Sequence, residues 1–259
     1  MTLFCGIDVG SAATKAVIIN ESLRELGRGL VPSGADFSAA ARKVFDQALE
    51  QAGAVEDGVA AVVSTGYGRT NVDFATGRRT EIDCHARGAY HHFPRAITVV
   101  DVGGQDNKII QVDSGGRRLK FAMNRKCSAG TGAFLEEMAL RLNVPIGKLS
   151  QMAEGSTDPG VSIGSYCTVF AMTEILSKVR AGVKAEDLAR AALVSVAKRV
   201  LETQAITTEI VATGGVVAHN PIMKEILKQI LKTEVHIPPH PQHIGAFGAA
   251  LVAASEHKE

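Results

Sequence analysis

The sequence predicts an α/β protein made of two similar domains, because one short phrase occurs in it twice. Asp-Val-Gly, four variable residues and a lysine lie between apolar stretches at Asp8–Lys15 and again at Asp101–Lys108. Each copy is typical of a strand, a tight glycine turn and a second strand, with a carboxylate at the end of the first strand. A repeat with this wide spacing indicates a duplicated domain, since the units of solenoid proteins are shorter.

The first domain is expected to begin with the Asp8 hairpin and to continue with a helix over 36–52. Apolar residues recur there at helical spacing, and Gly53 provides the stop signal. A short buried strand is predicted at 59–63. Because Pro94 indicates a domain boundary, we expect the first domain to comprise residues 1–94 together with the C-terminal segment 243–259.

The second domain is expected to comprise residues 95–242. Its predicted elements are a strand at 119–123, helices at about 131–143, 168–180 and 185–205, and a strand at 210–213. Gly214 and Gly215 form a turn after that last strand. Asn220 is expected to cap the next helix and Pro221 to occupy its first turn. A final helix over about 244–255 is expected to return to the first domain.

Composition narrows the class of protein. The 259 residues are 46% hydrophobic and 21% charged, which is ordinary for a soluble globular protein. The net charge of +1 gives no reason to expect binding to nucleic acid or to a membrane surface. The chain start carries no signal-peptide pattern, and no apolar run approaches the ~20 residues that span a bilayer. We therefore expect a cytoplasmic protein.

The two turns have the chemistry of a site for a nucleotide and its metal ion, although the sequence has no P-loop. Asp8 and Asp101 are suited to a hydrated Mg²⁺, which takes few carboxylates. Gln105 and Asp106 are candidates for orienting an attacking water. Glycine N–H groups, hydroxyls and an ammonium group can contact phosphate oxygens; the candidates are Gly10, Ser11, Thr14, Lys15, Gly103 and Gly104.

A single Asp-Val-Gly would be better explained as an ordinary turn at a strand end. The duplication, together with the turn at Thr213–Gly215, favours the nucleotide site.

Two of the four cysteines stand just before predicted helices. Cys127 has Ser128 and Thr131 beside it as expected caps, and Cys167 has Thr168. A helix N-terminus lowers the pKa of a thiol, and thiolates there suit an anionic iron–sulfur cluster. A cubane cluster needs four cysteines, so a two-fold dimer would have to supply the second pair. The alternative is that both cysteines are small buried apolar residues.

The Asp-Val-Gly turns and the turn at Thr213–Gly215 resemble the two phosphate loops and the adenosine site of the acetate kinase/sugar kinase/Hsp70/actin superfamily. The resemblance implies two ribonuclease H-like domains with ATP in the cleft between them.

Over essentially its whole length the chain also resembles the iron–sulfur ATPases that activate 2-hydroxyacyl-CoA dehydratases, and the ATPase subunits of benzoyl-CoA reductases. The most specific matches are Lys126–Gly132 and Cys167–Ala171. Other matching segments are the Asp8 loop, Thr65–Arg69, Cys84–Ala89, Asp101–Asp106 and Thr213–Gly215.

That resemblance implies a homodimer that shares one [4Fe–4S] cluster, ligated by Cys127 and Cys167 of both chains. Reduced ferredoxin or flavodoxin would deliver an electron, and ATP hydrolysis would drive its transfer to an iron–sulfur dehydratase or reductase under anaerobic conditions. Gln105 would position the attacking water. The positions that fall on the family's nucleotide motifs are Asp8, Ser11, Thr14, Lys15, Asp101, Gly103, Gly104, Gln105, Gly214 and Gly215.

Two departures from the dehydratase-activator pattern, Tyr166 and Met172, lie near the expected cluster and leave the partner open between a dehydratase and a reductase. Two other classes of function remain as alternatives. One is a small-molecule kinase of the same superfamily without a cluster, and the other is a nucleotide-sensing interaction protein with zinc at the cysteines. The pair Cys84 and His85 is too close in sequence for a shared metal ion, and no role is assigned to it.

Overall fold

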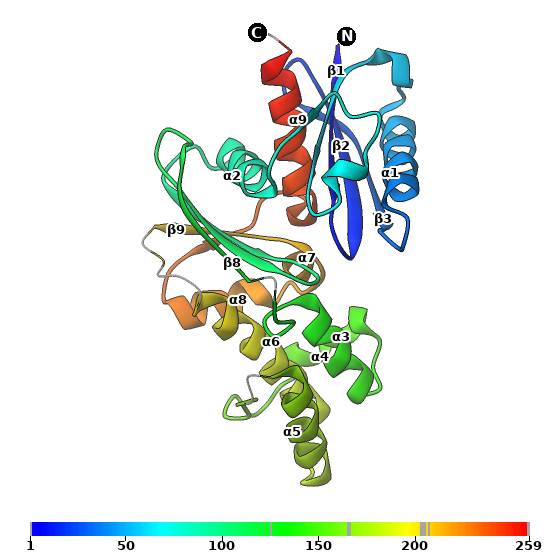
Figure 1. Cartoon of the computed structure of the whole chain (residues 1–259). Helices are drawn as coiled ribbons and strands as arrows, with labels where there is room; N and C mark the ends of the chain where they lie inside the picture. The colour runs from blue at the N-terminus through cyan, green and yellow to red at the C-terminus, as the bar shows by residue number, and fades with distance from the viewer. Residues whose placement is uncertain (1, 125, 165–166, 203–205, 207, 258–259) are drawn as a thin grey trace. The chain divides into compact units, whose positions relative to one another are not determined.

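The computed structural model describes residues 2–124, 126–164, 167–202, 206 and 208–257 (Figure 1). The chain divides into two compact units, each with its own hydrophobic core. The first unit comprises Met1–Ile97, Ile110–Lys120 and Gln242–Glu259, and the second comprises Thr98–Ile109 and Phe121–Pro241. The boundaries inferred from Pro94 stay a prediction.

The first sheet is mixed and has the strand order β3-β2-β1-β4-β5. β1 pairs antiparallel with β2 and parallel with β4, so that Asp8 lies opposite Lys15 on one side and Thr65 on the other. The strands are β1 (Leu3–Val9), β2 (Ala13–Asn20), β3 (Glu25–Pro32), β4 (Val59–Thr65) and β5 (Gly77–Arg78).

Alternate residues of β1 face two different cores. Leu3, Cys5 and Ile7 pack in a cluster with α1 (Phe37–Ala52), whereas Phe4 packs in a cluster with α9 (Ile244–Glu256). This is the two-residue period of a strand that is buried on both faces. In Figure 1, α1 lies beside the sheet on one side, and α9 lies beside it on the other with α2 (Glu81–His92).

Local signals account for the ends of α1. The Asp36 side chain accepts a hydrogen bond from the Ala39 N–H at 2.9 Å, and Gly53 adopts φ 60° after the last turn. The predicted helix over 36–52 is therefore confirmed. Helix α2, which begins after Thr80, was not predicted from the sequence.

The second sheet has the strand order β10-β9-β6-β7-β8. Its strands are β6 (Ile97–Val102), β7 (Asn107–Val112), β8 (Arg118–Asn124), β9 (Glu209–Thr213) and β10 (Val235–His236). The strands predicted at 119–123 and 210–213 are confirmed within β8 and β9. The repeated phrase thus forms the turn that joins two neighbouring strands in each sheet, β1 to β2 and β6 to β7.

Helices of the second unit surround the long helix α6, whose apolar face is buried against α3, α4 and α8. The helices are α3 (Gly132–Arg141), α4 (Leu149–Glu154), α5 (Thr168–Arg180), α6 (Ala185–Leu201), α7 (Gly215–His219) and α8 (Met223–Leu231). The prediction for 168–180 is confirmed in full. The predicted helix 185–205 ends at Leu201, and residues 203–205 lie outside the described residues. The 3₁₀ turns are Glu56–Gly58, Arg69–Asn71, Ile146–Lys148 and Pro241–His243.

The cap predicted at Asn220 is wrong. Its side-chain amide donates to the Val216 carbonyl at 2.9 Å and so ends α7, a helix that begins directly after Gly214. Pro221 lies in the turn that follows, and α8 begins only at Met223. The side-chain amide of Asn220 therefore bonds to the end of α7 and is not used to cap α8.

Helices long and apolar enough to cross a bilayer are not found among the described residues.

Candidate nucleotide site and cysteine pair

In the first unit, Asp8 lies at the end of β1, and its side chain is 7% exposed. Lys15 Nζ lies 3.2 Å from Asp8 Oδ2, as the antiparallel register brings the two residues opposite each other. The Gly10 N–H donates to the Ala13 carbonyl at 3.2 Å and closes the turn between the strands. The Lys15 side chain is 14% exposed, and its ammonium group compensates the charge of the carboxylate.

Ser33, which is not among the predicted site residues, supports this turn. Its hydroxyl donates to the Gly10 carbonyl at 2.6 Å and lies 2.9 Å from the Thr14 hydroxyl. Thr14 is fully buried, whereas Ser11 is half-buried on the turn. No motif indicates Ser33, because it reaches the turn from the end of β3 across the sheet.

In the second unit, the same construction recurs with the same distance. Lys108 Nζ lies 3.2 Å from Asp101 Oδ2, and the Gly103 N–H donates to the Asp106 carbonyl at 2.9 Å. Asp101 is 2% exposed and also accepts a hydrogen bond from the Thr213 hydroxyl at 2.8 Å. Lys108 is shared, since its Nζ lies 2.8 Å from Asp106 Oδ1.

Gln105, the residue predicted to position water, lies exposed on the second turn.

The duplication extends further than the repeated phrase. Gly66 follows β4 with φ 88°, and Gly214 follows β9 with φ 97°. A Cβ at Gly66 would lie 2.6 Å from the Val9 carbonyl oxygen, and one at Gly214 would lie 2.3 Å from the Val102 carbonyl oxygen. Any side chain would therefore push the neighbouring strand off the Asp-Val-Gly turn. The shared Thr-Gly dipeptides, Thr65-Gly66 and Thr213-Gly214, are the sequence signal for this equivalence.

Each unit thus offers one buried carboxylate with a lysine partner at a glycine turn. Carboxylate oxygens are ligands that Mg²⁺ accepts, and glycine turns can bring N–H groups close to phosphate oxygens. The residues present therefore fit a magnesium–nucleotide complex.

Both cysteines expected before helices are exposed, whereas Cys5 and Cys84 are buried. The Asn124 side chain holds the loop of Cys127, accepting from the Cys127 N–H at 3.3 Å and donating to its carbonyl at 2.9 Å. Cys167 directly precedes α5. The Ser128 and Thr168 hydroxyls lie 2.9 Å apart, so the residues that follow the two cysteines are hydrogen-bonded to each other.

Thr131 occupies the N-cap position of α3 as predicted, but the side-chain capping bonds expected beside the cysteines are not made. No side chain caps α3 or α5. The Thr131 hydroxyl donates to the Ser128 carbonyl at 2.6 Å instead. The first N–H groups of α3 have other partners, because Gly132 N donates to the Gly103 carbonyl at 2.9 Å and Ala133 N to the Gly104 carbonyl at 2.8 Å.

These two hydrogen bonds connect the second Asp-Val-Gly turn to the start of α3. The Asn107 side chain adds a third bond, from its Nδ2 to the Gly130 carbonyl at 3.2 Å. The candidate phosphate turn and the loop that carries Cys127 are therefore joined through backbone atoms inside one unit.

The exposed thiols fit half of a cluster site. In the part of the chain that the structure describes, no three His, Cys, Asp or Glu residues are placed to hold a metal ion, so the described residues of one chain complete no such site. Two thiols on hydrogen-bonded neighbouring segments match the half-share that a two-fold cubane would need. Met172 packs on the core of the second unit, and Tyr166 lies outside the described residues.

Exposure predicts which thiols react in the folded, metal-free protein. Burial raises the pKa of the Cys84 thiol to about 12 and raises that of Cys5 still further, so both stay protonated near neutral pH. Iodoacetamide at pH 8 is expected to modify Cys127 and Cys167 and to spare Cys5 and Cys84 until the protein is denatured. Mass mapping of tryptic peptides measures this pattern, and modification of Cys84 before Cys127 in the native protein would contradict it.

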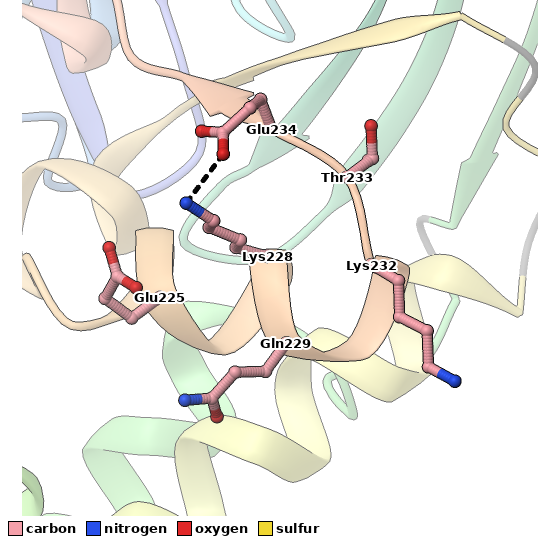
Figure 2. A pocket seen from close by; sticks show the side chains of 6 residues that line it. All are labelled: Glu225, Lys228, Gln229, Lys232, Thr233 and Glu234. Carbon is pink, nitrogen blue, oxygen red and sulfur yellow. Dashed lines mark ion pairs between the residues drawn. The ribbon is translucent and has the colours of Figure 1, made fainter.

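An open depression of about 470 Å³ lies along α8 in the second unit (Figure 2). Lys228 Nζ lies 2.6 Å from Glu234 Oε1 across it. The lining residues are Glu225, Lys228, Gln229, Lys232, Thr233 and Glu234, none of which is a predicted site residue. Its charges are mixed and neutralise one another, so we assign no ligand to it.

Known proteins that are similar in sequence and fold match nearly the whole chain. A 2-hydroxyisocaproyl-CoA dehydratase activator from Clostridioides difficile is 38% identical over 98% of this chain and 96% of its own length. The crystal structure of component A of the (R)-2-hydroxyglutaryl-CoA dehydratase of Acidaminococcus fermentans is 36% identical, covers 100% of both chains and has a TM-score of 0.95. The activator of the 2-hydroxyisocaproyl-CoA dehydratase from Clostridium difficile, solved with bound ADPNP, is 36% identical over 99% of this chain and 96% of that chain, with a TM-score of 0.92.

The predicted α/β fold of the actin-like and sugar-kinase type is confirmed. Residues 5–253 match the sequence model of the BadF/BadG/BcrA/BcrD ATPase family, which is nearly the whole chain. The chain therefore belongs to the BadF/BadG/BcrA/BcrD ATPase family.

Proposed function

We propose that this protein is an ATP-hydrolysing activator that drives low-potential single-electron transfer to an iron–sulfur partner enzyme. The observation that carries the proposal is the pair of hydrogen bonds from Gly132 and Ala133 to the second Asp-Val-Gly turn. A change at a bound phosphate can reach the Cys127 loop through these bonds without any intervening side chain. A plain phosphoryl-transfer enzyme has no need of such a link to two exposed cysteines.

The nucleotide is ATP with Mg²⁺ in this proposal. Asp8 and Asp101 hold the hydrated ion, and Gln105 positions the attacking water, which splits ATP into ADP and phosphate. The residues proposed to contact the nucleotide are Gly10, Ser11, Thr14, Lys15, Gly103, Gly104, Gly214 and Gly215. The ADPNP bound to a relative that is 36% identical supports an adenine nucleotide.

The electron carrier is one [4Fe–4S] cluster, held by Cys127 and Cys167 of each chain in a homodimer. When bound, the cluster supplies a one-electron redox centre at low potential. The chain's own contribution is to present the two thiols together, which the Ser128–Thr168 hydrogen bond supports. One electron arrives from reduced ferredoxin or flavodoxin and leaves to the iron–sulfur partner, so the activator itself is unchanged after a cycle.

A 2-hydroxyacyl-CoA dehydratase is the partner that we propose first. The relatives named above are dehydratase activators or components with 36–38% identity over nearly the whole chain. Met172, which departs from the usual dehydratase-activator sequence, packs on the protein's own core and so gives no reason to choose another partner. We expect the protein to act in the cytoplasm, where its four unpaired cysteines stay reduced.

The test is an anaerobic reconstitution. Purified protein is reduced, mixed with the C. difficile 2-hydroxyisocaproyl-CoA dehydratase and its 2-hydroxyacyl-CoA substrate, and assayed for the enoyl-CoA product. We expect product with ATP, and none with ADPNP or with ATP but no reductant.

Two results would count against the proposal. Iron-free protein after anaerobic purification would contradict the cluster. ATP turnover that rises with a small alcohol or acid acceptor would favour a small-molecule kinase. If the cluster is present but this dehydratase is not activated, an anaerobic pull-down that recovers a benzoyl-CoA reductase-like protein would identify a reductase partner.

A further inference from the structure

The proposed function leaves one sequence segment unexplained, the pair Cys84 and His85 on α2. His85 is 6% exposed, although histidine usually lies nearer the surface. The surroundings of this imidazole, all within the first unit, indicate what it does.

Close helix packing determines where the imidazole lies. Helix α9 packs against both β1 and α2. A Cβ at Gly248 of α9 would lie 1.8 Å from the Cys84 carbonyl oxygen, so the two helix backbones touch there. This contact brings the residue that follows Cys84 to the edge of the sheet where β1 ends.

Gly245, one turn earlier on α9, shows what the imidazole approaches. A Cβ at this position would lie 2.8 Å from His85 Nε2 and 3.0 Å from Asp8 Oδ2. His85 Nε2 and Asp8 Oδ2 therefore both border the space that one methyl group would fill. The distance between the two atoms cannot exceed the sum of these two distances. Asp8 and His85 are both more than nine-tenths buried, so few water molecules compete for this contact.

The second copy of the repeat shows what such a donor contributes. The Asp101 carboxylate accepts from the Thr213 hydroxyl at 2.8 Å in addition to its lysine partner. Thr65 occupies the corresponding place in the first copy, opposite Asp8 in the parallel register. Its hydroxyl makes no hydrogen bond to Asp8 and lies beside the Cys84 thiol instead. In the first copy His85 Nε2 borders the space beside the carboxylate, whereas in the second copy the carboxylate accepts from a threonine.

We propose that His85 is a positioning residue for Asp8, and that its Nε2–H donates to the Asp8 carboxylate and fixes the orientation in which Asp8 meets Mg²⁺ and the nucleotide. This inference rests on the proposed magnesium–nucleotide site. Lys15 holds the same carboxylate from the turn side at 3.2 Å, and the imidazole holds it from the side of α2 and α9. A carboxylate with two fixed donors loses less entropy when it binds a metal ion.

The first experiment is a calorimetric titration of full-length protein with ADP, in Mg²⁺ and in EDTA. His85→Leu is expected to weaken ADP binding in Mg²⁺ about 10-fold and to leave binding in EDTA unchanged, since one oriented hydrogen bond to a charged group is lost. His85→Gln places an amide N–H near the position of Nε2 and is expected to stay within about 3-fold of the wild type. The matched control is His91→Leu, on the exposed side of the same helix.

A second variant leaves both His85 and Asp8 in place. Gly245→Ala adds a methyl group in close contact with both His85 Nε2 and Asp8 Oδ2, which are side-chain ends that can shift without unfolding the helix. It is expected to reproduce the Mg²⁺-specific loss with an unchanged thermal midpoint. Equal losses in Mg²⁺ and in EDTA, failure of His85→Gln to retain binding, or wild-type affinity in both His85→Leu and Gly245→Ala would each overturn the role of His85.

The same titration separates this inference from the proposed function. Wild-type protein that binds no ADP in Mg²⁺ would overturn both. Wild-type protein that binds ADP and hydrolyses ATP, alongside unaffected His85→Leu and Gly245→Ala variants, would overturn the positioning role alone.

Discussion

Replacing Cys127 with serine is expected to remove nearly all iron from anaerobically purified protein and to abolish ATP-dependent electron transfer. The Cys127 thiol is exposed on a loop held by Asn124, and it is one of two exposed thiols in the chain. In a shared cluster the substitution removes two of four ligands at once, because both chains carry it. The hydroxyl of serine is a poor substitute for a thiolate. Iron analysis, expected to give about four iron atoms per wild-type dimer, measures the loss.

The matched control for this variant is Cys5→Ala. Cys5 is fully buried on β1 and packs among apolar side chains, so its loss removes a thiol without removing a candidate ligand. It is expected to retain iron and activity with slightly lower stability. ATP binding by Cys127→Ser should also survive, since the nucleotide residues are untouched. Normal iron content in Cys127→Ser would eliminate the proposed cluster.

Replacing Asp101 with asparagine is expected to lower the rate of ATP hydrolysis at least about 100-fold while leaving the protein folded. Such a loss is typical of removing one preorganised charge from a phosphoryl-transfer site. The buried carboxylate pairs with Lys108 and accepts from Thr213, and it is the proposed Mg²⁺ ligand of the second unit. Lys108 keeps Asp106 as a partner, so the variant does not leave an isolated buried ammonium group. Release of phosphate under saturating ATP measures the rate.

Asp106→Asn is the control, because it removes a negative charge beside Lys108 without removing the proposed Mg²⁺ ligand. Asp106 pairs with the same ammonium group at 2.8 Å, but its side chain is 25% exposed and lies on the turn, not at the strand end. A loss of less than about 10-fold is expected for it. Similar losses in both variants would mean that neutralising Lys108 matters and that Asp101 has no special role at the metal.

Local signals in the sequence were sufficient for much of the fold. Asp36 and Gly53 bracket α1 by hydrogen bonds within a few residues, and the repeated phrase predicts both strand pairs that carry the nucleotide turns. These features depend on neighbours in the chain, which is why a pattern can reveal them.

Features that depend on distant backbone were missed or mistaken. The side-chain capping bonds expected from Ser128 and Thr131 are not made, because carbonyls of the distant 103–104 turn accept from the first N–H groups of α3. The approach of His85 to Asp8 arises where α9 packs on α2 and β1, and no local pattern reports it. The shared Thr-Gly dipeptides are visible in the sequence. Only the register of β4 with β1, however, shows that Thr65 corresponds to Thr213.

The bonds that join the 103–104 turn to α3 use only main-chain atoms. Every amino acid except proline carries the N–H group they require at positions 132 and 133. In a mutational scan of positions 132 and 133, only proline would therefore remove these hydrogen bonds directly. Other substitutions would act through the packing around them. Gly132→Ala keeps the N–H group but would place a Cβ 3.1 Å from Gly104 Cα, so that substitution disturbs the turn by contact and not by loss of the hydrogen bond.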